Sequence, residues 1–215
     1  MKRLSVWTTL GLGLAIVAWT VAGCAGKGEV RHLDLHTKKP AAQSTYPNPV
    51  KIIVQPFEDR RSEKNRVGMR RDLWGGVTNF NVAGERPGDL IAEALADRLK
   101  TRGWQEQAWN ADVSPDGSAD DADIVITGQL QNFSANAVSR PFSTVIDTNS
   151  KFKIQARNLG DKSTTTHSVE VSESKTVFWF DTDDVQELLT VTLNDGIDRL
   201  LADTVIEQKS LRAKR

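Results

Sequence analysis

Hydrophobic and polar residues alternate with a period of two along three stretches of the second half of the chain: 122–133, 151–157 and 169–180. Such alternation is typical of strands that have one buried side and one solvent-facing side. The turn-rich residues 158–162 predict a hairpin between the second and third of these stretches. A β-branched run within 50–57, closed by a proline, predicts a further, buried strand.

Two other stretches repeat apolar residues at helical spacing. The first follows Pro87 and ends at Gly103, and Asp89 in its first turn suits the positive end of a helix. The second runs from Val185 to Val205, directly after a group of aspartates and a threonine that can cap a helix. The second helix is the longer one, and we expect it to cover one face of the sheet.

Together these elements predict an α+β fold, with a mixed, largely antiparallel sheet of about four to five strands and two helices packed on it, the longer one C-terminal. Residues 104–109 are a candidate for an additional short strand. The predicted boundaries are a single domain at 50–208 and a basic tail at 209–215.

The N-terminus has the layout of a secretory signal peptide. Lys2 and Arg3 precede an apolar stretch at 10–21, and small residues follow it. The apolar stretch is shorter than the ~20 residues that span a bilayer, which favours a cleaved signal peptide at 1–23 over a permanent transmembrane helix.

The sequence Val21-Ala-Gly-Cys24 resembles the lipobox of bacterial lipoproteins, and Cys24 is the single cysteine of the chain. The resemblance implies that Cys24 becomes the mature N-terminus and carries diacylglycerol and a further acyl chain such as palmitate, which together anchor a protein stably. Ala25 after the cysteine implies, by the same resemblance, transfer to the outer membrane. The following residues, 24–49, are rich in proline and lysine and predict a flexible tether.

The charges change this picture little, because 28 basic and 28 acidic residues give no net charge and no basic field that would favour nucleic acid. One segment, 58–76, combines several arginines with a Trp-Gly-Gly sequence. Arg60, Arg61 and Trp74 are therefore a candidate ligand or partner surface, since guanidinium groups and an exposed indole can hold a phosphate, a carboxylate or a glycan. The interspersed acidic residues favour the alternative, a solvated loop.

No catalytic motif accompanies these features. The sequence has no Gly-x-Ser-x-Gly, P-loop or His-Glu-x-x-His motif, so it predicts no catalytic residues, no enzyme and no cofactor. His32 and His36 lie four apart without further ligands nearby, and 112–123 fits a calcium loop only in part. We therefore expect no metal site.

Three short motifs extend the resemblance beyond the anchor: Val50-x-Ile-x-Val-x-Pro-Phe-x-Asp-x-Arg60, Leu99-x-x-x-Gly-Trp104 and Ala122-Asp-Ile-Val-Ile-Thr-Gly128. With the long final helix, they resemble periplasmic lipoproteins of the YajG type. This resemblance implies a lipid-anchored cell-envelope protein of the outer membrane, with a non-catalytic binding or scaffolding domain in the periplasm and an envelope protein or cell-wall partner. An auxiliary lipoprotein of an envelope transport or lipid-handling system is the alternative.

Overall fold

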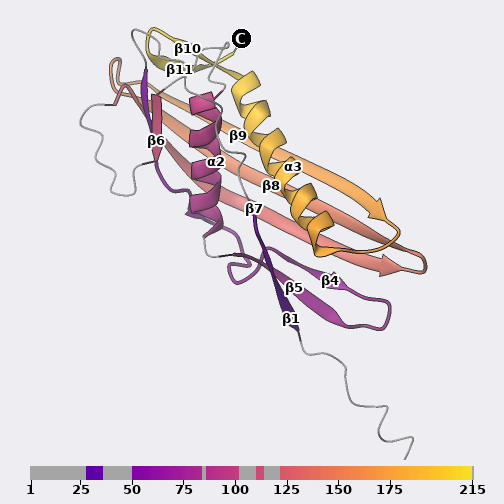
Figure 1. Cartoon of the computed structure of the whole chain (residues 1–215). Coiled ribbons are helices and arrows are strands. Elements are labelled where there is room, and N and C mark those ends of the chain that lie inside the picture. The colour runs from indigo at the N-terminus through magenta and orange to yellow at the C-terminus, as the bar shows by residue number, and fades with distance from the viewer. Residues whose placement is uncertain (1–27, 36–49, 84–85, 102–109, 114–121, 215) are drawn as a thin grey trace, which may run out of the picture.

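The computed structural model describes residues 28–35, 50–83, 86–101, 110–113 and 122–214. It has a mixed β-sheet with two helices on one of its faces, and a small hairpin at the C-terminal end (Figure 1). The elements, in chain order, are β1 (Glu29–Leu33), β2 (Lys51–Val54), β3 (Glu58–Asp59), β4 (Gly68–Arg71), β5 (Val77–Val82), α2 (Pro87–Thr101), β6 (Asn110–Val113), β7 (Ile124–Arg140), β8 (Ser143–Asn158), β9 (Thr164–Val177), α3 (Thr182–Ala202), β10 (Thr204–Glu207) and β11 (Ser210–Ala213).

The long strand β7 organises the sheet. One of its edges pairs along the whole length of β8, which in turn pairs with β9, and both pairings are antiparallel. Its other edge pairs with three short strands one after another, β2, β3 and β4, all in the parallel direction. β6 extends the sheet beyond β2, while β5 and β1 extend it beyond β4.

The predicted alternation is confirmed in the long strands. Along β8, every second side chain from Thr144 to Asn158 is buried, and most of the residues between them are exposed. The buried side faces the helices, because α3 packs on β8 and β9 while α2 packs closest to β2 and β6. The opposite face is polar, and neither helix packs on it (Figure 1).

Both predicted helices are present. Asp181 is the N-cap of α3, where its side chain accepts a hydrogen bond from the backbone N–H of Asp183 and the Asp184 side chain completes a capping box. The buried stripe of α3 includes Val185, Leu189 and other apolar residues at helical spacing. The capping residues and the apolar stripe together explain why the helix begins at Thr182.

An aromatic pair lies at the centre of the core, between the sheet and α3. The rings of Phe57 and Phe152 lie 6.1 Å apart between centroids. Phe57 packs flat against Gly128, because a Cβ atom at that glycine would lie 2.4 Å from its ring carbons. On the α3 side, a Cβ atom at Gly196 would lie 3.0 Å from the ring of Phe152. The glycine that ends the motif at 122–128 is thus explained by close packing on a ring.

The sheet has more strands than predicted. Among the described residues it has nine strands, with a separate two-stranded sheet of β10 and β11, and not about four to five. The additional strands have two to six residues, too few to show a clear periodic pattern. They are held by strand pairing: β3 and β4 pair with β7, β5 with β4, β1 with β5 and β6 with β2. The long helix ends at Ala202, and Val205, predicted as its last apolar residue, lies in β10. The expectation of largely antiparallel pairing holds for the long strands, whereas the short strands on the other edge of β7 are parallel to it.

The folded part also extends beyond 50–208. β1 lies inside the predicted tether 24–49 and pairs with β5, so the tether is not continuous. The predicted tail 209–215 contains β11, whose Leu211 exchanges two hydrogen bonds with the buried side chain of Asn158. Residues 104–109, the candidate for a short strand, lie outside the described residues.

A carboxylate also connects the β10–β11 hairpin to the β8–β9 turn. Asp161 accepts hydrogen bonds from Ser163 and Ser210 and forms an ion pair with Arg212. Hydrogen bonds from the Ser163 side chain and backbone, aided by Ser210 and Arg212, lower the pKa of Asp161 to about 2.

Neither described helix is long and apolar enough to cross a membrane.

Candidate functional site

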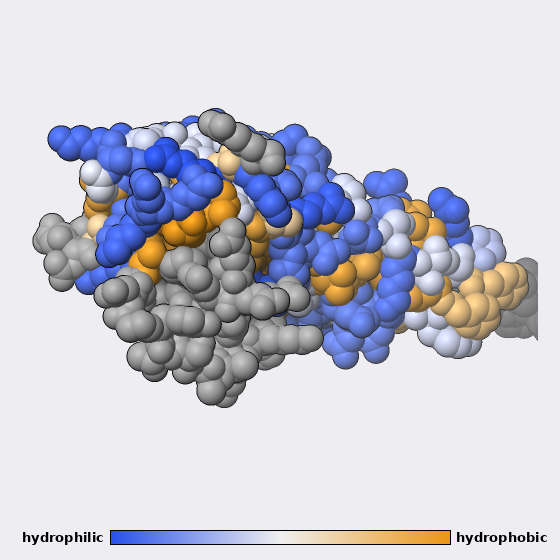
Figure 2. Space-filling view, turned by 90° about the horizontal axis from the view of Figure 1, so that it is seen from above, coloured by the Kyte–Doolittle hydropathy of each residue, from blue (hydrophilic) through white to orange (hydrophobic). Residues whose placement is uncertain are grey.

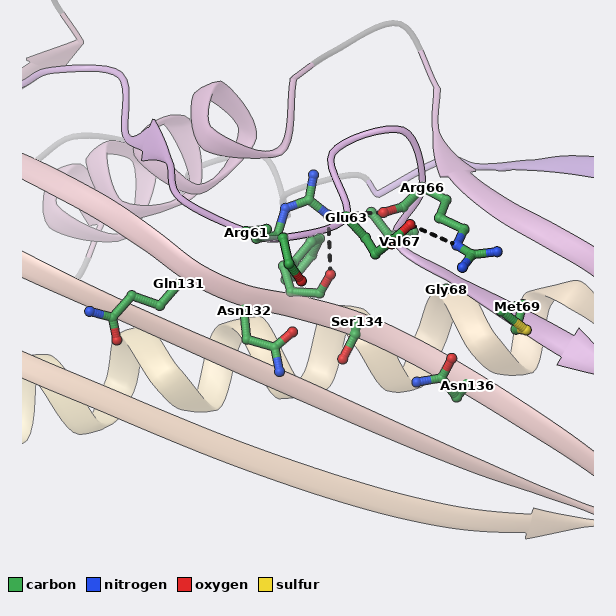
Figure 3. A pocket seen from close by; sticks show the side chains of 12 residues that line it. Arg61, Glu63, Arg66, Val67, Gly68, Met69, Gln131, Asn132, Ser134 and Asn136 are labelled. Atoms are coloured by element: carbon green, nitrogen blue, oxygen red, sulfur yellow. Dashed lines mark hydrogen bonds and ion pairs between the residues drawn. The ribbon is translucent and has the colours of Figure 1, made fainter.

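A polar cleft interrupts one edge of β7. β3 pairs with β7 at residues 129–130 and β4 pairs with it at 135–138, and the loop 60–67 bulges outward between the two pairings. The space beneath this loop is a cleft of about 320 Å³, shown in Figure 3. Its lining comes from the loop, from the start of β4 and from β7: Arg61, Ser62, Glu63, Arg66, Val67, Gly68, Met69, Gln131, Asn132, Phe133, Ser134 and Asn136.

The wall formed by β7 owes its polarity to a bulge. The register between β7 and β8 shifts between Leu130 and Asn132, which makes Gln131 the extra residue. Beyond the bulge, Asn132, Ser134 and Asn136 follow one another on the sheet face away from the helices, as the row of side chains in Figure 3 shows. Amide and hydroxyl groups both donate and accept hydrogen bonds, so this row can bind polar groups of either kind. β-bulges frequently lie beside functional sites, where they redirect side chains.

A buried ion pair fixes the opposite wall. The Arg61 side chain is 6% exposed and donates from Nε and Nη2 to the two carboxylate oxygens of Asp59, at 3.0 and 2.9 Å. Its Nη1 atom donates to the backbone carbonyl oxygens of Arg66, at 3.1 Å, and Phe133, at 3.4 Å. The guanidinium group therefore ties the two ends of the loop together and ties the loop to β7.

The same contacts set the charge of Asp59. Burial raises the pKa of this carboxyl group, but hydrogen bonds from the Arg61 side chain and backbone, together with the charges of Arg61 and Lys64, outweigh burial and leave the pKa below its ordinary value. Asp59 is thus ionised at neutral pH, and its ion pair with Arg61 has a structural role.

Arg66 provides an accessible cation at the rim of the cleft. Its side chain is about one third exposed, and it donates to Oδ1 of Asn79 at 3.1 Å and lies 3.4 Å from the Glu63 carboxylate. Glu63 itself is well exposed. A polar ligand in the cleft would therefore meet one positive and one negative group beside the row of Asn132, Ser134 and Asn136, which we call the amide row.

Gly68 allows β4 to approach β7 closely at the edge of the cleft. A Cβ atom at this position would lie 1.7 Å from the backbone oxygen of Ala135. Any larger residue would force the two backbones apart. The width of the cleft thus depends on this glycine.

The structure does not bring Arg60, Arg61 and Trp74 together as one surface. Arg60 is exposed and forms a 2.8 Å ion pair with Glu58. Arg61 is buried and lines the cleft, and its guanidinium group donates to Asp59 and to two carbonyl groups, so it forms no exposed surface with Arg60 and Trp74. Trp74 is 94% exposed on the β4–β5 turn, at the far end of β4. Cys24 lies outside the described residues.

The amide row is the part of the site that the sequence reasoning missed. The pattern predicts a strand that ends at Phe133, whereas β7 continues to Arg140. The signal that could have revealed the row is the run of polar residues at alternate positions, Asn132, Ser134 and Asn136, which continues across the predicted end at Phe133. Within the described part of the chain, no three His, Cys, Asp or Glu side chains gather as a metal site would require.

Comparison with known proteins identifies the fold alone. No family model matches the chain, and no curated protein matches it. Protein XCC0632 from Xanthomonas campestris, of family DUF330, has a TM-score of 0.53 and 10% identity, with 80% of this chain and 92% of that chain covered. An uncharacterized protein has a TM-score of 0.50 and 6% identity, with coverages of 82% and 98%.

A lipoprotein, GNA1162 from Neisseria meningitidis, is a more distant structural neighbour. It has a TM-score of 0.34 and 11% identity, and the match covers 68% of this chain and 97% of that chain. Likeness at this level supports no inference about function. The YajG-type resemblance accordingly stays a prediction from the sequence motifs.

Proposed function

We propose that this protein is a lipid-anchored protein of the bacterial outer membrane, held through Cys24, whose domain in the periplasm is a non-catalytic binding or scaffolding module. The anchor rests on the motif Val21-Ala-Gly-Cys24, and the observation that carries the binding role is the polar cleft beside β7, with its row of amide and hydroxyl side chains. The partner is an envelope protein or cell-wall material that offers hydrogen-bonding groups. Nucleic acid is not the expected partner, since the chain has no net positive charge.

The chemistry of the cleft supports binding over lipid handling. A carrier of lipid tails needs an apolar lining, because polar groups without partners are costly against hydrocarbon. Most of the side chains that line this cleft are polar or charged. A wider hollow of about 620 Å³ beside the first half of α3 is likewise lined mainly by acidic and amide residues.

The open face of β7, β8 and β9 enlarges the surface available to a partner. Its polar side chains pair across the strands, as between Lys151 and Glu170 at 2.7 Å and between Asn149 and Ser172 at 2.7 Å. A smaller hollow of about 100 Å³ lies on the same strands near Lys153 and Gln155. The face therefore offers a partner many charged and hydrogen-bonding groups next to the cleft.

Photo-crosslinking in living cells tests the binding role of the cleft. A benzophenone amino acid replaces Asn136, which is exposed in the cleft, or Glu207, which is exposed on β10 at a distance from it. We expect Asn136 to yield a recurrent crosslinked envelope protein or cell-wall fragment by mass spectrometry, and Glu207 not to yield it. If both positions give the same crosslinks, or neither gives any, the cleft is not the binding site.

Replacing Cys24 with serine tests the anchor. We expect the Cys24→Ser protein to leave the membrane fraction and appear in the soluble envelope fraction, because the acyl chains that hold it can no longer be attached. Mass spectrometry of the N-terminal peptide of the natural protein should show the acyl mass on Cys24. Retention of Cys24→Ser in the outer-membrane fraction at the natural level would contradict a lipid anchor.

A further inference from the structure

Exposed large apolar side chains gather at one end of the molecule. Five of the eight that are exposed among the described residues lie in three neighbouring turns, and we call these five the aromatic tip: Leu73 and Trp74 between β4 and β5, Phe142 between β7 and β8, and Phe178 and Trp179 between β9 and α3. Trp74, Phe142 and Trp179 are each more than 80% exposed. Exposed aromatic side chains grouped in this way mark an interaction surface.

Strand register places the three turns side by side. The last pair of β4 with β7 joins Arg71 to Val138, so the β4–β5 turn projects at the same end as the β7–β8 turn. The pairing of Thr144 with Val177 brings the end of β9 to the same place. Figure 1 shows the three turns at one end of the sheet, and Figure 2 shows apolar residues among hydrophilic ones on the surface toward this end, at the right.

The local structure holds these side chains outward. The backbone N–H groups of Trp74 and Gly76 donate to the Asp72 carboxylate at 2.9 and 2.7 Å, which fixes the β4–β5 turn. The rings of Phe178 and Trp179 meet edge to face at 5.1 Å. The next residue, Phe180, turns inward, where its ring stacks on Phe80 and lies 4.0 Å from the Arg70 guanidinium. Phe178 and Trp179, the two residues before Phe180, are therefore kept out of the core by their positions in the turn between β9 and α3.

The start of the folded chain lies at the same end. β1 is parallel to β5, and Glu29 pairs with Thr78, the second residue after the β4–β5 turn. Cys24 precedes Glu29 by five residues. Even a fully extended chain covers only ~3.5 Å per residue, so the Cα atom of Cys24 lies within about 18 Å of that of Glu29. A lipid on Cys24 would hold this end of the molecule, and no other, next to the bilayer.

We propose that the aromatic tip rests on the lipid bilayer and inserts its side chains into the interface between headgroups and acyl chains. This inference rests on the lipid anchor proposed above. Tryptophan is the residue that favours the membrane–water interface most strongly, and phenylalanine and leucine enter the apolar layer beneath it. Arg71 and Arg140 are exposed beside the tip, where their guanidinium groups can meet lipid phosphates.

Three of the acidic residues at this end are used by the fold, while Asp183 is exposed at the start of α3. The Asp72 carboxylate lies within its turn, Asp181 caps α3, and Asp184 forms a 3.0 Å ion pair with Lys175. A tip inserted in this way would fix the orientation of the domain, with the long sheet pointing away from the membrane. The polar cleft would then be presented to the periplasm at a defined height.

Quenching of tryptophan by brominated lipids tests this contact. The chain from Cys24 onward contains every described residue and four of the six tryptophans. Its single thiol is coupled to a maleimide lipid in vesicles of phosphatidylethanolamine and phosphatidylglycerol, so that the anchor is in place whether or not cells acylate Cys24. With brominated acyl chains in the vesicles, we expect strong quenching of wild-type fluorescence and loss of most of that quenching in W74F/W179F.

The single variants W74F and W179F show which turn inserts, and V191S, which changes an exposed valine on α3 away from the tip, is the matched control. The fluorescence of V191S should be quenched as strongly as that of the wild type. Equal quenching of the wild type and W74F/W179F, or no quenching of either, would overturn the proposal. Dimerisation without vesicles that the double variant W74E/W179E abolishes would assign the tip to a second copy of the chain and would also overturn it.

Discussion

Replacing Phe152 with alanine is expected to lower the free energy of unfolding by about 4 kcal/mol. The ring is 1% exposed and lies between the ring of Phe57 and Gly196 of α3. Its removal would leave a cavity where β8, the loop after β2 and the long helix meet. The sheet and the helix are held apart by their own backbones, so the cavity can collapse only in part.

Urea unfolding followed by circular dichroism measures this effect, and the melting temperature should fall by about 10 °C for a domain of this size. Phe142→Ala is the matched control, since Phe142 is 83% exposed in the β7–β8 turn. We expect it to change the free energy of unfolding by less than about 0.5 kcal/mol. A loss below about 1 kcal/mol for Phe152→Ala would show that this ring does not bridge the sheet and α3.

Arg61→Ala should have the second largest effect, a loss of roughly 2 to 3 kcal/mol. The substitution leaves the Asp59 carboxylate without its charged partner, keeping only the backbone N–H of residue 61, and leaves the carbonyl groups of Arg66 and Phe133 without this side-chain donor. This loss is smaller than the roughly 3 to 5 kcal/mol typical of broken buried pairs, because the Asp59 side chain is 23% exposed and water can solvate it in part.

Arg60→Ala provides the control for this prediction. Arg60 is adjacent in sequence, carries the same charge and also contacts an acidic residue, Glu58, but its side chain is 60% exposed. Exposed ion pairs contribute little, so we expect less than about 0.5 kcal/mol. Equal losses for the two variants in thermal unfolding would contradict the structural role assigned to Arg61.

The effect of Arg61→Ala should also depend on pH. Because the pKa of Asp59 in the folded protein lies below its ordinary value, the pair stabilises the fold at neutral pH, and this contribution is lost as the pH falls through the folded pKa. In Arg61→Ala, burial still raises the pKa of Asp59, and only the backbone N–H of residue 61 and the charge of Lys64 still lower it, so this pKa is higher than in the wild type. The difference in stability between wild type and variant should therefore be largest near about pH 7 and smaller near about pH 3, and a constant difference would argue against it.

The elements that the sequence predicts well are those whose pattern is long. β8 and β9 alternate over fourteen or more residues, and α3 repeats its apolar stripe over 21 residues, so that each shows its buried side many times. The short strands β3 and β4 have two and four residues and show no period. They are strands because β7 offers an unpaired edge, which is a property of the folded sheet.

The candidate site likewise depends on features that only the folded sheet creates. The cleft exists because the loop 60–67 leaves β7 between two short pairings, and because a bulge at Gln131 turns a row of amides toward the gap. The departure of the loop and the position of the bulge have no local signature, although the alternating polar residues of the row do. Nothing in the sequence distinguishes Arg60 from its neighbour Arg61. Burial in the fold makes Arg61 a structural cation and leaves Arg60 in solvent.

The sequence by itself determined the α+β class, the two helices and the alternating long strands, because these follow from contacts between residues that are close along the chain. It also supplied the lipobox motif, which is read as a linear string. Only the tertiary structure decided that three distant turns carry their aromatic side chains to one end, beside the start of β1. The physical reason is that strand register is set by long-range backbone pairing and burial of one face, and it thereby fixes where residues far apart in sequence meet.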